Sequence, residues 1–417
     1  MEFCRDVTVF DFFEQPLLKS LDFCGKMWYH KQKTSGTTGA KVEEYQMNTT
    51  CMSYPPAVCA VRQTYQILVP VHTPTVLWVR VGKKIYYDDS NGILRSDTVL
   101  HRVSVPASVL DAAGEYTVCW REVVERRPYF SKMKEEQSET FSFCPVRSDP
   151  IRAYMIADAH GKFDETVGAA KKFAEVYGGI DLLILNGDIL DHSGDAENFM
   201  LYYRIAGEIT GGAVPVVISR GNHDLRGKCA EQLASYMPNE NGNSFYSFRL
   251  GNLWGILLDC GEDKDDGHPE YNGTVCCHAF RERETAYLKA IIRNAKKEYN
   301  APGVEHRIVI SHVPFTQIDR DPFNIEQKIY GEWVRMLNEK IHPELLLSGH
   351  VHLAYITRPG DARDSYGMTF PTVVGSEVRS KESYFAGCGI VWDEGRVRVV
   401  LNDRDGIRQE CDPREKK

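Results

Sequence analysis

Five short clusters of polar residues stand out because each combines side chains that bind metal ions in proteins. Each cluster directly follows a short apolar run of the kind that forms a buried strand. In an open α/β sheet, ligand sites form beyond the carboxyl ends of the strands, so loops far apart in the sequence can bring such residues together. The clusters are Asp158-Ala-His160, Gly187-Asp188-Ile-Leu-Asp191, Gly221-Asn222-His223-Asp224, Ser311-His312 and Gly349-His350-Val-His352.

The residue types in these clusters favour a catalytic type of metal centre over a cysteine-rich zinc site. Carboxylate, amide and imidazole groups bind Mn, Fe, Zn and similar ions, and the clusters contain no cysteine. His350 and His352 face the same side of an extended segment, so that two adjacent ions can each take one. Any one cluster alone is more often a turn or a helix cap. All five together, in order and each after a predicted strand, predict a metal centre.

The elements that must position these clusters alternate between strand and helix from residue 151 onward. Short apolar runs predict strands over residues 152–157, 181–185, 215–219, 307–310 and 344–347. Apolar residues at helical spacing predict helices over residues 163–177, 197–209, 281–299 and 331–341. Residues 244–259 and the C-terminal runs YFAGCGIVWD and RVRVVLND predict further strands. This alternation predicts an α/β domain with short buried strands.

The pattern between residues 63 and 143 is different. Six short runs rich in Val, Tyr, Trp and Thr are separated by turn signals such as Asp89-Ser90-Asn91-Gly92. This spacing predicts a small antiparallel β-sandwich. Residues 1–60 give no firm secondary structure and are interpreted as an extension of the sandwich. We therefore expect two domains, a β-sandwich domain with its extension over residues 1–148 and a catalytic domain over residues 149–417.

The clusters resemble the signature of the calcineurin-like metallophosphoesterase superfamily, which is DxH, GDxx[D/Y], GNH[D/E], a lone His and GHxH. The resemblance implies a fold in which two sheets form a β-sandwich flanked by helices, here preceded by a smaller all-β, fibronectin-like sandwich. It also implies the metal ligands: Asp158, His160 and His352 for one ion, Asn222, His312 and His350 for the other, and Asp188 as the bridge. In the same way, it implies that His223 meets the phosphate or the leaving group and that Asp224 orients His223.

The N-terminal sandwich followed by this domain also resembles purple acid phosphatases, with one departure. That subfamily places a tyrosine where this chain has Asp191, and its first motif ends in glycine instead of His160. We therefore expect neither an iron–tyrosinate chromophore nor an Fe(III)-specific site. The expected cofactors are two divalent transition-metal ions: Mn, Fe, Zn or a mixture.

These residues together predict a metal-dependent phosphoric ester hydrolase. Two ions ~3.5–4 Å apart lower the pKa of a bridging water, and the resulting hydroxide attacks phosphorus in line. The expected partner is a small-molecule phosphate ester. Alternatives on the same scaffold are a nuclease, a cyclic-nucleotide phosphodiesterase or a pyrophosphatase. An alternative of another class is a non-catalytic binding protein that uses the sandwich domain.

Size and charge bear on these alternatives. A chain of 417 residues suits two domains, and a formal net charge of -8 argues against nucleic-acid binding through a basic surface. The N-terminus has acids among its apolar residues and lacks the apolar core of a secretory signal. No apolar run approaches the ~20 residues of a membrane span. We therefore expect a cytoplasmic protein without membrane contact.

Overall fold

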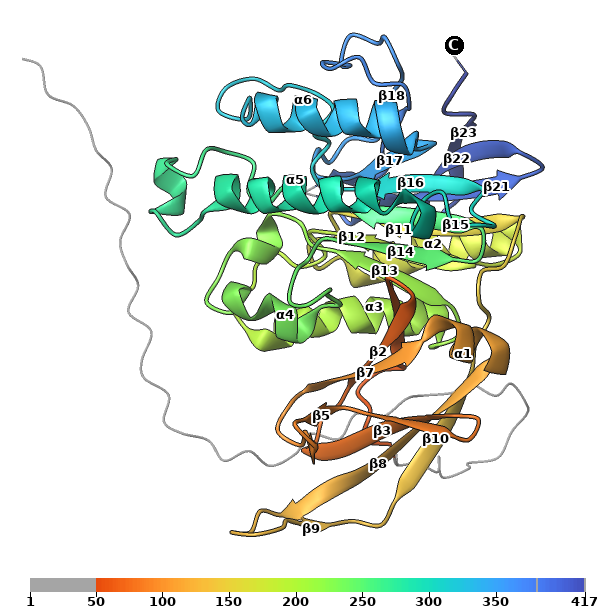
Figure 1. The fold of residues 1–417 in the computed structure, drawn as a ribbon, viewed down its shortest axis with the longest axis vertical. Helices are drawn as coiled ribbons and strands as arrows, with labels where there is room; N and C mark the ends of the chain where they lie inside the picture. Colours follow the sequence, from red (N-terminus) through yellow and green to blue (C-terminus); the bar gives the residue numbers. More distant parts are fainter. Residues whose placement is uncertain (1–49, 380–381, 416–417) are drawn as a thin grey trace, which may run out of the picture. The chain divides into compact units, whose positions relative to one another are not determined.

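The computed structural model describes residues 50–379 and 382–415. Most of the predicted N-terminal extension, residues 1–49, lies outside the described residues. Residues 51–417 form one compact unit. Figure 1 shows the strands of this unit, and its residue range contains all five polar clusters.

A ten-stranded sheet forms one half of the catalytic core. Its strands are β1 (Ala57–Val61), β2 (Thr64–Pro70), β7 (Leu100–Pro106), β11 (Ile151–Ile156), β12 (Leu182–Asn186), β13 (Pro215–Ser219), β20 (Glu377–Arg379), β21 (Tyr384–Asp393), β22 (Arg396–Asp403) and β23 (Ile407–Cys411). Their order is β23-β22-β21-β11-β12-β13-β1-β2-β7, with β20 paired to β21. The central strands β11, β12 and β13 are parallel and almost wholly buried. Parallel strands covered on both faces read as continuous apolar runs, which is why the sequence predicts them well.

A six-stranded sheet forms the other half. Its strands are β14 (Tyr246–Leu250), β15 (Leu253–Leu257), β16 (His306–Ile310), β17 (Leu345–Ser348), β18 (Tyr355–Thr357) and β19 (Thr372–Val374). Their order is β14-β15-β16-β17-β19-β18. One apolar cluster joins the two sheets, since it contains Met155 and Ile184 from the first and Ile308 and Leu347 from the second. The predicted two-sheet sandwich is confirmed.

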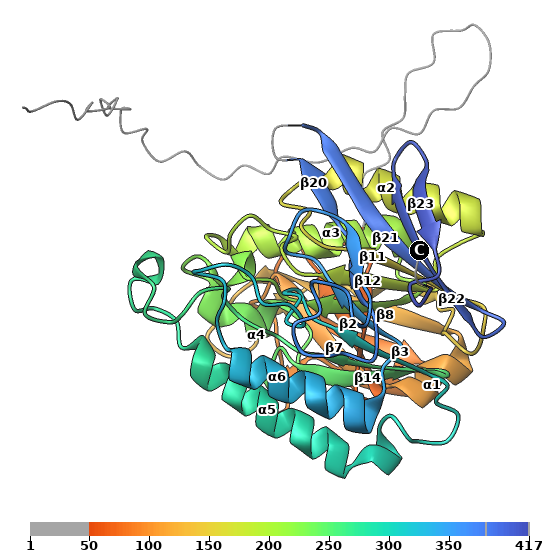
Figure 2. The ribbon, with the colours of Figure 1, turned by 90° about the horizontal axis from the view of Figure 1, so that it is seen from above.

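Helices cover the outer faces of both sheets (Figure 2). Helices α2 (Phe163–Tyr177) and α3 (Met200–Thr210) pack on the ten-stranded sheet, and α5 (Cys277–Arg293) and α6 (Gln327–Met336) pack on the other. The predicted helix over residues 163–177 is confirmed at both ends. Helix α6 continues as a π-helical turn over Leu337–Ile341, and two shorter helices are α1 (Ala107–Ala113) and α4 (Leu233–Tyr236). Among the described residues, no helix combines the length and apolarity needed to cross a bilayer.

The six strand-like runs predicted before residue 148 all form strands, but they divide between two sheets. A five-stranded sheet contains β3 (Thr75–Val81), β4 (Lys84–Tyr87), β8 (Glu115–Glu125), β9 (Lys132–Met133) and β10 (Gln137–Ser142). The hairpin of β5 (Asp89–Ser90) and β6 (Ile93–Leu94) encloses the predicted turn. In contrast, β2 and β7 extend the ten-stranded sheet. The smaller all-β unit therefore shares a sheet with the catalytic core.

Strand β1, which the sequence does not predict, makes the connection. It pairs with β13 in parallel, with Val58 opposite Pro215, and with β2 in antiparallel orientation. Without β1, the backbone groups of β13 would form a sheet edge open to other strands. The domain boundary between residues 148 and 149 stays a prediction about folding units, and strands from both of its sides share this sheet.

A fragment of residues 149–417 should therefore express mostly as insoluble protein, because it exposes the edge of β13 and the apolar surface beneath the missing strands. A fragment of residues 51–417 should stay soluble, because it keeps the whole sheet. Any soluble fraction of the shorter fragment should still bind metal, since every candidate ligand lies beyond residue 149. Solubility and melting temperature of the two fragments check this expectation. A soluble 149–417 fragment that melts like the longer one would show that β1 contributes nothing to the catalytic unit.

Candidate metal centre

The carboxyl ends of β11, β12, β13, β16 and β17 bring the five polar clusters to one place. Three groups of side chains offer ligand atoms that lie within 4.8 Å of one another. They are Asp158 with His160 and His352, Asp188 with His312 and His350, and His160 with Asp191 and His223. The structure thus gathers the residues that the sequence singles out, including the exposed side chain of Asp191, which the resemblance assigns to neither ion.

The backbone at most of these positions is strained. Five of the seven candidate ligands have a left-handed backbone, which residues other than glycine rarely adopt. The angle φ is 55 at Asp158, 42 at His160, 52 at Asp188, 72 at His350 and 59 at His352, in degrees. Such strain persists only where the surrounding structure imposes it, and it concentrates at functional sites.

Two glycines allow the loops to approach one another. A Cβ atom on Gly221 would lie 2.7 Å from the backbone nitrogen of Asp188, and one on Gly349 would lie 2.7 Å from Oδ2 of Asp158. Both distances are well below van der Waals contact. Any larger residue at either position would push a candidate ligand out of the centre.

His312 and Asp188 form the buried floor of the centre. The Nδ1 atom of His312 lies 2.7 Å from the carbonyl oxygen of Asn186 and donates to it. This bond leaves a lone pair on Nε2, which lies 3.1 Å from Oδ2 of Asp188 and has no hydrogen-bond partner. Burial opposes the charged imidazole, but Asp188 outweighs burial and raises the pKa of His312 to about 10. A positive charge between these two atoms is therefore favoured, and a metal ion supplies it as well as a proton does.

Asp158 is held in place from two sides. Its carboxylate accepts the backbone N–H of His350 at 2.9 Å and the hydroxyl of Ser376. The Nε2 atom of His352 lies 3.5 Å from Oδ1 of Asp158, and Nε2 of His160 lies 3.0 Å from Nε2 of His352. Two ligand atoms ~2.1 Å from one cation lie ~3.0–3.4 Å apart, so these separations suit a shared ion.

Asn222 completes the second group. Its side-chain amide lies 3.1 Å from Nδ1 of His350 and 3.2 Å from Oδ2 of Asp188. In the absence of an ion, the amide satisfies its neighbours when Nδ2 donates to these two atoms and Oδ1 accepts from Nη2 of Arg226. Turned the other way, the amide oxygen joins Asp188 and His350 as a donor to a second ion.

Comparison with known protein families identifies the domain that carries the candidate metal centre. A sequence model of the calcineurin-like phosphoesterase family matches residues 151–354, the range that contains all seven candidate ligands. The chain carries a calcineurin-like phosphoesterase domain. It is accordingly a hydrolase of the metallophosphoesterase type. A search of curated proteins by sequence gave no significant match.

A solved structure shows the same fold as this phosphoesterase chain. A purple acid phosphatase from yellow lupin (Lupinus luteus) seeds has a TM-score of 0.52 at 11% identity, over 86% of this chain and 74% of that one. The similarity extends beyond the phosphoesterase domain and includes the N-terminal sandwich. A more distant structure, the protein TT1561 of Thermus thermophilus, has a TM-score of 0.32 at 14% identity, over 64% of this chain and 100% of that one.

His223 lies at the edge of the phosphoesterase centre. Its Nδ1 atom lies 2.8 Å from the carbonyl oxygen of Asp191, and its Nε2 atom lies 3.1 Å from Nη1 of Arg226. The imidazole ring is 4.7 Å from the ring of His160, centroid to centroid. His223 is therefore oriented by the main chain of Asp191, with Nε2 next to a guanidinium group.

Asp224 does not make the contact that the sequence resemblance implies. Its carboxylate points inward and accepts the backbone N–H of Gly221 at 2.7 Å and the hydroxyl of Tyr202 at 2.8 Å. Burial, together with the nearby Asp188, raises the pKa of Asp224 to about 7. The described contacts of Asp224 hold the loop that carries Asn222, and none of them orients the imidazole of His223.

The acidic loop after β15 is mostly exposed or half-buried, but Glu262 and Asp263 near its start turn toward the centre. Glu262 is 1% exposed and accepts two hydrogen bonds from Arg226, both at 2.9 Å. Asp263 lies 3.5 Å from Nε2 of His350. The start of the loop therefore forms a wall of the centre through Glu262 and Asp263. Neither His268 nor His278 has a described contact with the candidate ligands.

A cavity of about 300 Å³ adjoins the centre at His350 and Asp263. Its walls are largely apolar and come from the loops after β16 and β17 and from α6. They include Val313, Pro314, Phe315, Phe323, Ile325 and Tyr330, together with the acid Asp319. No lysine or arginine lines this cavity among the described residues. It can hold an apolar group attached to a phosphate at the centre.

Proposed function

We propose that this domain hydrolyses small phosphate esters with two divalent transition-metal ions. The observation that carries the proposal is a pair of buried carboxylates, Asp158 at 0% and Asp188 at 1% exposure. Within residues 50–379 and 382–415, neither forms an ion pair with lysine or arginine; both face imidazoles instead. Buried anions are stable only when cations offset them, and imidazole, amide and carboxylate donors together suit Mn, Fe or Zn.

The two groups of donors support two ligand sets. We assign Asp158, His160 and His352 to one ion, Asn222, His312 and His350 to the other, and Asp188 to both. When bound, such ions lower the pKa of a coordinated water and neutralise charge on the phosphoryl oxygens. The protein fixes the tautomer of His312 through the carbonyl of Asn186, and it holds Asp158 through the backbone of His350. These outer contacts set the orientation of the ligands.

His223 and Arg226 complete the proposed phosphate site. Arg226 offers a guanidinium that Glu262 holds from one side, while its Nη1 atom points to His223. Arginine suits the forked geometry of a phosphate. We propose that Arg226 positions the phosphate and that His223 donates to the departing oxygen. The alcohol part of the ester would occupy the apolar cavity beside His350.

Purified protein should contain close to two transition-metal ions per chain, and chelation should abolish hydrolysis of an aryl phosphate. Elemental analysis and restoration of activity with Mn, Zn or Fe check this. A His306→Gln variant is the matched control, because Asp149, Glu305 and His306 form a separate group of possible ligands away from the centre. The variant should keep the same metal count.

The same assay separates the alternative functions. Protein without Mn, Fe, Zn, Co or Ni, and without activity after these metals are added, would exclude the proposed centre. Protein that binds metal but hydrolyses no phosphomonoester, diester, nucleotide or pyrophosphate would be a binding protein instead. The ranking of substrates in that panel distinguishes a phosphatase from a nuclease, a cyclic-nucleotide phosphodiesterase or a pyrophosphatase.

A further inference from the structure

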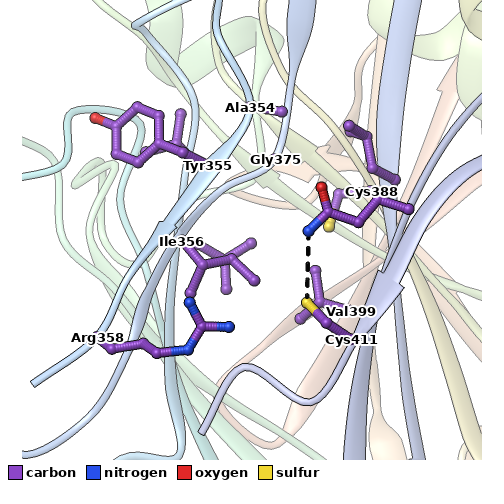
Figure 3. Close-up of a pocket in the computed structure, with 12 residues that line it drawn as sticks. Ala354, Tyr355, Ile356, Arg358, Gly375, Cys388, Val399 and Cys411 are labelled. Carbon is purple, nitrogen blue, oxygen red and sulfur yellow. Dashed lines mark hydrogen bonds between the residues drawn. The ribbon is translucent and has the colours of Figure 1, made fainter. Parts of the chain in front are cut away.

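A second cavity, of about 220 Å³, lies between the two sheets at their C-terminal strands (Figure 3). One wall comes from β18 and β19 of the six-stranded sheet, and the other comes from β21, β22 and β23 of the ten-stranded sheet. The residues that matter here are Ile356, Val374, Val399 and Leu401, with Arg358 and Gln409 as polar members. None of them belongs to the candidate metal centre.

The strand register explains why the body of this cavity is apolar. Cys388 lies opposite Leu401 across β21 and β22, and Leu401 lies opposite Gln409 across β22 and β23. Val399 and Leu401 are two residues apart, so their side chains share the face that turns toward the other sheet. The short strand β18 faces them with Ile356, which is only half-buried. The sheets therefore leave an apolar space between them at this end.

Arg358 is unusual in such a place. The residue as a whole is half-buried, but its Nε atom is buried and has no hydrogen-bond partner. Among the described residues, its guanidinium forms no ion pair. The one carboxylate whose pKa it helps to lower, Asp412, is already bonded to Arg414. In Figure 3 the guanidinium lies beside Ile356 and faces Cys411 across the cavity. A guanidinium that has a buried, unbonded Nε atom and no paired carboxylate has its positive charge available to an anion that enters the cavity.

We propose that this cavity binds an amphipathic monoanion, a carboxylate with a short aliphatic chain. The carboxylate would pair with Arg358, and the chain would lie between Ile356 and Leu401. The amide of Gln409 is available as a second donor, since its described bond to Cys411 is long, at 3.9 Å. A volume of about 220 Å³ has room for a short aliphatic chain.

Binding to the intact protein, with its metal ions, tests the proposal by calorimetry with octanoate, octanol and octylamine. Octanoate should bind ~10-fold or more tightly than octanol, because a charge-assisted hydrogen bond adds to the same apolar contact. Octylamine should bind more weakly than octanol. Equal affinities for octanoate and octanol, or no binding of octanoate at concentrations up to ~1 mM, would overturn the proposal.

Two variants and one control locate the ligand. Arg358→Gln should remove the preference for octanoate over octanol while leaving the melting temperature of the ligand-free protein no lower. Leu401→Trp should fill the cavity and abolish binding of both ligands. Arg396→Gln is the matched control, because Arg396 is exposed on β22 and does not line the cavity. Octanoate binding that survives in both Arg358→Gln and Leu401→Trp would place the ligand elsewhere and refute the assignment.

Discussion

Replacing Asp188 with asparagine should lower kcat for aryl phosphate hydrolysis by at least ~10³-fold, more than the ~10–100-fold typical of an outer-shell partner. Asp188 is the residue assigned to both ions, so the change weakens both and removes one negative charge from the pair. Elemental analysis should find fewer than two ions per chain. His352→Gln should have the smaller effect, since His352 belongs to one ligand set.

Two further measurements test whether unfolding, instead of loss of the metal ligand, causes the fall in kcat. The metal-free Asp188→Asn protein should stay folded, as circular dichroism can show, although it should melt lower than metal-free wild type because it loses the buried partner of His312. Asp195→Asn is the matched control: Asp195 is an exposed acid on the same loop, paired with Lys228. It should hydrolyse the substrate normally. If Asp188→Asn retains both ions and normal turnover, the bridging assignment is wrong.

Replacing His223 with alanine should keep both metal ions and slow hydrolysis according to the leaving group. General acid catalysis is typically worth ~10²–10⁴-fold, and it matters most when the departing oxygen is strongly basic. We therefore expect a loss in that range on an alkyl phosphate and a much smaller loss on 4-nitrophenyl phosphate. The unequal loss would show that the imidazole delivers a proton.

The contacts of His223 indicate which of its two ring nitrogens would donate the proton. Because Nδ1 donates to the carbonyl of Asp191, a proton for the leaving group must come from Nε2, which now faces Arg226. Arg226 must therefore turn toward the phosphate when substrate binds. Arg226→Gln should slow the hydrolysis of both substrates to a similar extent, in contrast to His223→Ala. Equal losses on both substrates with His223→Ala would instead assign His223 to phosphate positioning, and loss of metal would assign it to the centre itself.

The sequence predicts the parts of this fold that depend on neighbours in the chain. The buried strands β11 to β13 are largely apolar runs, and α2 shows its apolar face at regular spacing, so the sequence predicts both. The candidate ligands stand out in the sequence because each directly follows a strand, where the topology of a parallel sheet brings loops together; their role as ligands stays a prediction. The left-handed backbone at these positions is not predicted by the sequence, because glycine is the usual indicator of that conformation and these residues are not glycine.

Features set by distant residues escape such reasoning. Strand β1 exists because it pairs with β13, more than 150 residues later. Helix α5 was expected to begin at residue 281 but begins at Cys277, where Asp266 accepts the backbone N–H of that residue. The burial of Glu262 depends on Arg226, and the inward turn of Asp224 depends on Tyr202. Each of these contacts joins residues that are not neighbours in the sequence, so it follows only from the tertiary structure.

The sheet that runs from β13 through β1 to β2 and β7 also governs how this molecule can move. Domain closure needs a hinge, a few residues free to absorb large changes in φ and ψ. Here backbone hydrogen bonds cross between the two regions, and rotation would have to break them. Substrate entry and product release must therefore depend on local displacements of the loops after β15, β16 and β17. The N-terminal strands therefore restrict rotation between the two regions, and displacement of the loops around the centre is the motion that the shared sheet leaves open.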